Sequence, residues 1–213
     1  MFDIVLFDLD GTLTESGIGI TRSVAYALRK HGIEETDQKK LDRFVGPPLI
    51  GAFMEFYGFS REQAVQAVED YREYYAVRGI FENRVYDGVE QMLQQLRDAG
   101  KHCVLATSKP EHYARQIMEH FGLSPYFCCI AGATMDEKRT NKAEVIAYAL
   151  EHCGVSGRVV MVGDREHDIL GAKAHGLASV GVLYGYGSRE ELEHAGASAI
   201  AKTPDEVVKY VIA

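Results

Sequence analysis

Two aspartates stand one residue apart at the end of an apolar run, in the stretch FDLDGTLTES at residues 7–16. Acidic side chains are rare in strands and costly to bury unpaired, so Asp8 and Asp10 require a cation, a basic side chain or a charged substrate. If the strand persists through Leu9, both side chains lean to the same side; if the turn begins earlier, Asp10 can offer its backbone carbonyl. Either arrangement predicts an oxygen-rich site.

A second segment, ATSKP, ends the next apolar run with hydroxyl side chains. Thr107 and Ser108 precede Pro110, and we expect this proline at the first position of a helix. The free N–H groups of such a helix start can hold a phosphate, or the hydroxyls can merely cap the helix. Both interpretations stay open at this point.

A lysine and two more acids complete the set. Lys142 lies near the start of an expected amphipathic helix, where it opposes the helix dipole, and an anionic site would offset that cost. Asp164 ends another apolar run, and Asp168 follows one helical turn later. Four acids then meet at one edge of a sheet, and their hard oxygen atoms favour Mg²⁺.

The elements that position these residues alternate between short β-rich runs and helical stretches, which is typical of an α/β fold with a Rossmann-like parallel sheet. About ninety residues separate the first two β-rich runs, more than one crossover helix needs. We therefore expect a small α-helical domain at residues 16–81, inserted into a core of residues 1–15 and 82–213. The expected strands lie at residues 3–7, 102–107, 126–132, 158–163 and 178–185.

The insertion shows helix signals throughout. Ser60 with Gln63 forms a capping-box pattern, whereas the glycine-containing residues 17–20 are interpreted as a hinge that enters the insertion. Its aromatic residues recur at helical spacing, which is more typical of helix packing than of a ligand cage. These aromatic residues are Phe53, Phe56, Tyr57, Tyr71, Tyr74 and Tyr75.

Composition limits the classes of partner. The chain has 213 residues, 46% of them apolar, and its 31 acidic and 23 basic residues give a net charge of −8, which disfavours nucleic acid or an anionic membrane. Its four cysteines lack metal-binding spacing, and we expect reduced core thiols. No apolar run reaches membrane-spanning length and the first residues lack a signal-type pattern, so we expect a cytoplasmic protein.

The four segments resemble, in order and spacing, the motifs of the haloacid dehalogenase-like (HAD) hydrolase superfamily, and specifically its phosphoglycolate phosphatase-like branch. The resemblance implies a HAD-like core, a helical cap after the first motif, and hydrolysis of a phosphate monoester through an aspartyl-phosphate. It assigns Asp8 as nucleophile and Asp10 as general acid and then base. Mg²⁺ would be held by Asp8, the Asp10 carbonyl and Asp164.

The same resemblance implies further roles. Thr107, the Ser108 amide and Lys142 would hold the transferring phosphoryl group, and Asp168 would orient Lys142 or a metal-bound water. Because dehalogenases lack an aspartate two residues after the nucleophile, Asp10 favours phosphoryl transfer over carbon–halogen cleavage.

The substrate is expected to be a small phosphorylated metabolite: phosphoglycolate, a nucleotide, a sugar phosphate, phosphotyrosine or pyrophosphate. Arg43, Gly46 and Pro47 are candidates for a specificity loop of the cap, although a plain connection between helices fits them equally. A phosphomutase of the β-phosphoglucomutase type is the alternative activity. A phospho-aspartate signalling module is a further alternative, and the chain is expected to be a monomer or a dimer.

Overall fold

The computed structural model of the chain describes residues 1–135, 138–154 and 156–213. These residues form two compact units, one of Met1–Thr14 with Val85–Ala213 and one of Glu15–Arg84. The insertion expected at residues 16–81 differs from the second unit by one residue at its start and three at its end.

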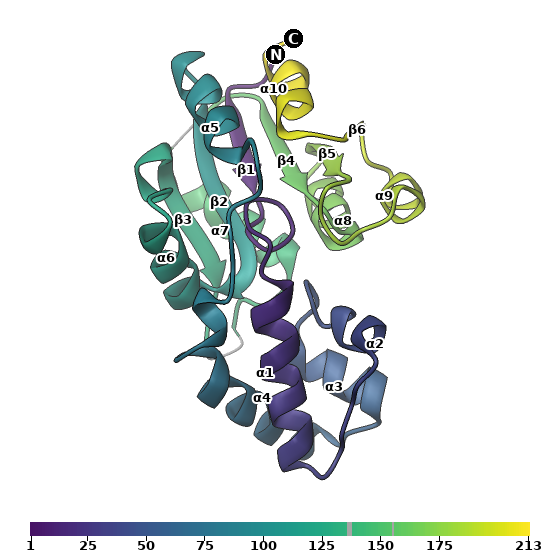
Figure 1. The fold of residues 1–213 in the computed structure, drawn as a ribbon. Coiled ribbons are helices and arrows are strands. Elements are labelled where there is room, and N and C mark those ends of the chain that lie inside the picture. Colours follow the sequence, from purple (N-terminus) through teal and green to yellow (C-terminus); the bar gives the residue numbers. More distant parts are fainter. Residues whose placement is uncertain (136–137, 155) are drawn as a thin grey trace. The chain divides into compact units, whose positions relative to one another are not determined.

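The first unit is built on a sheet of six parallel strands in the order β3-β2-β1-β4-β5-β6 (Figure 1). The predicted α/β class and parallel sheet are therefore confirmed. The sequence indicated five strands, whereas the sixth has only three residues and leaves no recognisable apolar run. The strands are β1 (Ile4–Phe7), β2 (His102–Pro110), β3 (Phe127–Ala133), β4 (Val159–Gly163), β5 (Ala178–Val182) and β6 (Ala199–Ala201).

Helices follow most of these strands, as expected for parallel connections. The helices of the first unit are α5 (Val89–Asp98), α6 (Glu111–His120), α7 (Lys142–His152), α8 (Glu166–Ala174), α9 (Arg189–Ala195), α10 (Pro204–Ile212) and the short 3₁₀ helix η2 (Ser124–Tyr126). Within the described residues, no helix of the chain combines the length and apolarity that crossing a membrane requires.

The central strand β1 is buried on both faces. Ile4 and Leu6 belong to a hydrophobic cluster that includes residues of α7 and α8. Val5 and Phe7 alternate to the opposite face and have no exposed area. This burial explains why the strand reads as a continuous apolar run rather than an alternating one.

The strand order decides where a ligand can bind. The chain adds β2 and β3 on one side of β1 and then crosses to place β4 on the other side. In open α/β sheets, the crevice at the carboxyl ends of the strands where this reversal occurs is the usual ligand site. The segments that follow β1, β2 and β4 therefore come together at one edge of the sheet.

The second unit consists of helices only: α1 (Gly17–Lys30), α2 (Gln38–Asp42), α3 (Leu49–Tyr57), α4 (Arg61–Tyr75) and the 3₁₀ helix η1 (Gly79–Phe81). The capping box of Ser60 and Gln63 is confirmed at the start of α4. Phe53, Tyr71 and Tyr75 are buried, which confirms that these aromatic residues pack between helices. The hinge interpretation of residues 17–20 is wrong, because these residues form the first turn of α1.

The cysteine prediction also needs correction. Cys129 on β3 and Cys153 at the end of α7 form a disulfide, with 5.6 Å between their Cα atoms. Cys128 is an exposed thiol, and only Cys103 among the four is a buried free thiol. The expectation of reduced core thiols failed because the pairing depends on how β3 and α7 pack, which sequence spacing does not reveal.

Close backbone packing in the helical unit explains one glycine of α1. A Cβ atom added to Gly19 would collide with the carbonyl oxygen of Gly79, at the start of η1. By contrast, a Cβ atom on Gly51, an exposed residue of α3, would meet no atom within 4 Å. The two glycines therefore allow opposite predictions for the same substitution.

We expect Gly19→Ala to lower the free energy of unfolding by about 2 kcal/mol, because the backbone of Gly79 has to move. Gly51→Ala should raise it by about 0.5–1 kcal/mol, since alanine loses less conformational freedom in a helix. Urea unfolding followed by circular dichroism measures both. A Gly19→Ala protein as stable as the wild type would contradict the close packing.

Candidate active site

Asp8 follows β1 directly and is buried at the carboxyl end of the strand. Its N–H group still donates to the carbonyl of Val162, the β4 neighbour, at 3.0 Å. The chain then turns, because the N–H groups of Leu13 and Thr14 both donate to the carbonyl of Leu9, at 2.9 and 3.0 Å. Of the two arrangements considered from the sequence, the early turn is therefore the one observed.

The Lys142 ammonium lies between two of the predicted acids. Its Nζ atom is 2.9 Å from Oδ1 of Asp8 and 2.8 Å from Oδ1 of Asp168, and it donates to the carbonyl of Ala106 at 3.0 Å. Lys142 is only 4% exposed and is the first residue of α7. Burial lowers the pKa of Lys142, but the two carboxylates outweigh that effect and raise the pKa above its usual value.

Asp164 directly follows β4 and Asp168 lies in the first turn of α8, as their spacing predicted, and both are buried. Asp164 accepts hydrogen bonds from the Thr12 hydroxyl at 3.3 Å and from the Tyr186 N–H at 2.8 Å. Burial, followed by repulsion from Asp168, raises the pKa of Asp164 well above its usual value. Burial also raises the pKa of Asp168 to about 6, although the nearby Lys142 ammonium opposes this shift.

A second buried lysine was missed by the sequence analysis. Nζ of Lys109 is 2.9 Å from Oδ2 of Asp10, and both side chains are largely buried. The hydroxyls and the proline are the strongest local signals of the segment ATSKP, whereas the signal for this pair is a lysine beside an expected acidic site. Asp10 and Lys109 thus form an ion pair that links the ends of β1 and β2.

The hydroxyl residues lie where β2 ends. Thr107 is buried, and its Oγ1 atom accepts a hydrogen bond from the N–H of Lys109 at 3.2 Å, while Ser108 is half-buried. The expected helix begins one residue later than predicted: α6 starts at Glu111, and Pro110 is the residue before it. Lys142 reaches this segment through the Ala106 carbonyl, so Thr107 and Lys142 belong to one site.

The loop after β5 encloses Asp164 and was also missed. The Tyr186 N–H bonds the Asp164 carboxylate, and a Cβ atom on Gly185 would collide with Asp164 and with the carbonyl of Gly11. Glycine is therefore required at position 185 by close approach to the acid. The run of alternating glycine and tyrosine at residues 184–187 was the available signal, but its partner lies far away in the sequence.

The donor set fits a divalent cation. Asp8, Asp164 and Asp168 each offer a carboxylate oxygen, and these atoms lie within 4.8 Å of one another. Among the acids of the site, Asp10 pairs with Lys109, and Asp8 and Asp168 pair with Lys142. Hard carboxylate oxygens of this kind suit a hard divalent cation better than a softer metal.

Arg43, Gly46 and Pro47 lie in the helical unit, in the segment that connects α2 with α3. The Arg43 guanidinium lies 3.7 Å above the ring of Phe56 and 4.0 Å from Glu55, and it remains exposed. The relation of these three residues to the acids of the sheet unit stays a prediction.

Residues 5–182 match the haloacid dehalogenase-like hydrolases, and the chain belongs to this family. The resemblance found in the sequence is thereby confirmed. The match covers strands β1 to β5 and the acids at their carboxyl edge, whereas β6 lies beyond it.

Three similar proteins illustrate the range of the family. A 5'-nucleotidase of Pseudomonas aeruginosa is 47% identical over 189 residues, covering 88% of this chain and 86% of that protein. Tyrosine-protein kinase PtkA of Mycobacterium tuberculosis is 40% identical over 208 residues, covering 96% of this chain and 70% of that protein. The crystal structure of a predicted phosphatase from Clostridium acetobutylicum is 48% identical, with a TM-score of 0.96 and coverage of 100% and 99%.

The raised pKa values predict how pH controls metal binding. Because the pKa of Asp168 is raised to about 6 and that of Asp164 is raised as well, protons compete with a cation for both carboxylates as the pH falls. We expect Mg²⁺ to raise the melting temperature little at pH 5 and clearly at pH 7.5, with Asp164→Asn losing most of the increase. Thermal unfolding with and without EDTA measures this, and an equal increase at both pH values would contradict it.

Proposed function

We propose that this chain is a Mg²⁺-dependent phosphatase that hydrolyses a small phosphate monoester through an aspartyl-phosphate on Asp8. The observation that carries the proposal is the buried Lys142 ammonium, which lies 2.9 Å from the Asp8 carboxylate within a cluster of acids. A carboxylate held beside a fixed cation can approach a phosphate dianion without prohibitive repulsion.

The proposed reaction has two displacements at phosphorus. An Asp8 oxygen attacks the phosphoryl group, the bond to the leaving oxygen breaks, and Asp10 gives a proton to the departing alkoxide. Water then attacks the aspartyl-phosphate while Asp10 takes its proton. The bond between phosphorus and the Asp8 oxygen breaks, which releases phosphate and restores the carboxylate.

Other residues would hold the phosphoryl group during both steps. Thr107, the Ser108 amide and Lys142 would bind its oxygen atoms, and the Lys109 ammonium keeps Asp10 at the mouth of the site. A divalent cation held by Asp8, the Asp10 carbonyl and Asp164, with Asp168 in support, would reduce the repulsion between nucleophile and phosphate.

Asp8→Asn should lower the turnover of p-nitrophenyl phosphate by about a thousandfold or more, because the nucleophile is removed. Thr107→Ala should cost less, about a hundredfold, since other donors still hold the phosphoryl group. Phosphate release in the presence of Mg²⁺ measures both, with Asp205→Asn as a control that alters an exposed carboxylate. Near wild-type turnover in a folded Asp8→Asn protein would refute the mechanism.

Incubation with a sugar phosphate and Mg²⁺ distinguishes the alternative activities from hydrolysis. Isomerised sugar phosphate without free phosphate would favour a phosphomutase. A lasting acyl phosphate without catalytic release would favour a phospho-aspartate signalling module.

The names of the similar proteins guide the choice of substrates. One relative is named as a 5'-nucleotidase and another as a tyrosine kinase, so a panel should contain nucleoside monophosphates, phosphoglycolate, sugar phosphates, phosphotyrosine and pyrophosphate. All of these carry the phosphoryl group that the acids and lysines would hold. Transfer from ATP to a tyrosine peptide is measured beside the panel, and phosphate appearing on the peptide would argue against simple hydrolysis.

We further propose that the helical unit acts as a cap and that Arg43, with Gly46 and Pro47, contributes to specificity. Arg43→Ala should then raise the KM of the preferred substrate about tenfold while changing p-nitrophenyl phosphate turnover much less, because only the leaving group loses a contact. Arg22→Ala is the matched control, since it removes another exposed arginine of this unit that pairs with a glutamate. Equal effects of the two substitutions would exclude a specific role for Arg43.

A further inference from the structure

The position of Lys142 depends on where α7 begins. Lys142 is the first residue of that helix, and its ammonium must reach Asp8, Asp168 and the Ala106 carbonyl at once. A buried cation shared by two carboxylates tolerates little displacement, because a lost partner leaves an unpaired charge in the interior.

The helix cap fixes the local shape of this segment. The Asn141 side chain accepts from the Glu144 N–H at 3.0 Å, and the Glu144 carboxylate accepts from the N–H groups of Asn141 and Thr140 at 3.3 and 2.8 Å. These bonds all lie within residues 140–144. They define the first turn of α7 but do not fasten it to the sheet.

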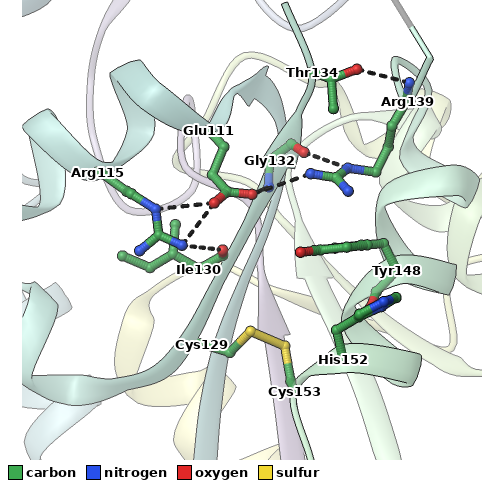
Figure 2. A network of polar contacts seen from close by, with 10 residues as sticks. All are labelled: Glu111, Arg115, Cys129, Ile130, Gly132, Thr134, Arg139, Tyr148, His152 and Cys153. Carbon is green, nitrogen blue, oxygen red and sulfur yellow. Dashed lines mark hydrogen bonds and ion pairs between the residues drawn. A yellow bond between two sulfur atoms is a disulfide. The ribbon is translucent and has the colours of Figure 1, made fainter.

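Arg139, three residues before Lys142, makes that connection (Figure 2). Its Nε atom donates to the carbonyl of Gly132 on β3 at 2.7 Å, and a terminal nitrogen lies 3.2 Å from Glu111 at the start of α6. Its guanidinium plane covers the ring of Tyr148 on α7, 3.6 Å from the ring centre. One side chain therefore joins β3, α6 and α7.

Glu111 extends the connection to the segment at the end of β2. It directly follows Pro110, so it ends the segment that carries Thr107, Ser108 and Lys109. The pair of Arg139 and Glu111 thus links this segment to the one that carries Lys142.

We infer that Arg139 is a positioning residue that sets the place of Lys142 relative to Thr107 and Asp8, an inference that rests on the proposed function. The planar guanidinium suits this task, because it bonds a carbonyl and a carboxylate along its edge while its face lies on an aromatic ring. Side-chain exposure of only 16% keeps these contacts away from competing water.

Arg115 is a matched residue that distinguishes two roles for Arg139, the positioning of Lys142 and the simple support of strand β3. Arg115 on α6 bonds the same Glu111 carboxylate, at 2.7 and 3.0 Å, and donates to another β3 carbonyl, that of Ile130, at 3.2 Å. Arg115 lies on a different element from Lys142, and Figure 2 shows it on the far side of Glu111 from Arg139. Support of β3 alone would make the two arginines equivalent.

Arg139→Ala should lower kcat for p-nitrophenyl phosphate by about tenfold to a hundredfold and weaken the binding of inorganic phosphate in the presence of Mg²⁺ at least about threefold. Arg115→Ala should change both quantities by less than about twofold, because it removes an exposed ion pair. Arg139→Lys should resemble Arg139→Ala, since lysine keeps the charge but lacks the planar guanidinium group. Equal effects of Arg139→Ala and Arg115→Ala would overturn the inference.

Lysine labelling tests the position of Lys142 without relying on any activity. Acetylation by an activated ester, followed by mass spectrometry, should modify Lys142 several-fold faster in Arg139→Ala and at the wild-type rate in Arg115→Ala. Lys109, also buried, is the internal control for general loosening and should stay protected. Unchanged labelling of Lys142, or equal gains at both lysines, would refute the inference, whereas a wild type without phosphatase activity would refute only the proposed function.

Discussion

The arrangement of the acids at the carboxyl edge of the sheet depends on one buried cation, the Lys142 ammonium between Asp8 and Asp168. These two acids follow different strands of the sheet, and the lysine comes from a third segment, so the ion pairs join three parts of the chain. In an interior of low polarity, removing one member of such a pair destabilises the protein strongly, because the other member is left as an unpaired buried charge. The contacts that surround the proposed nucleophile Asp8 therefore also join separate parts of the first unit.

The sheet order explains why so many acids meet at one place. With β1 between β2 and β4, the residues that follow these strands share an edge, and each strand contributes at least one charged group. Helix α8 adds Asp168 in its first turn, and α7 brings Lys142. Burial, aided by neighbouring carboxylates, raises the pKa values of Asp164 and Asp168. Burying several acids together costs stability locally, and in the proposed function a cation and a phosphate would offset that cost.

Much of this site could be predicted because its residues adjoin strong local signals. Asp8 and Asp164 follow apolar runs directly, and Lys142 starts an amphipathic helix, so pattern alone placed all three. The partners that were missed depend on contacts between distant segments. The pair of Lys109 and Asp10, the enclosure of Asp164 by Gly185 and the disulfide of Cys129 with Cys153 arise only when strands and loops are brought together.

The arginines beside Glu111 have a consequence for the free edge of the sheet. Strand β3 is the outermost strand on its side, and the carbonyls of Ile130 and Gly132, two residues apart, accept from Arg115 and Arg139. The Gly132 N–H donates to Glu111 as well, at 3.4 Å. An exposed edge strand invites pairing with a strand of another molecule and leads to aggregation. Here three of the groups that such a strand would need, two carbonyls and one N–H, are already bonded to side chains, so the contacts of Glu111, Arg115 and Arg139 also make edge-to-edge pairing at this part of β3 less favourable.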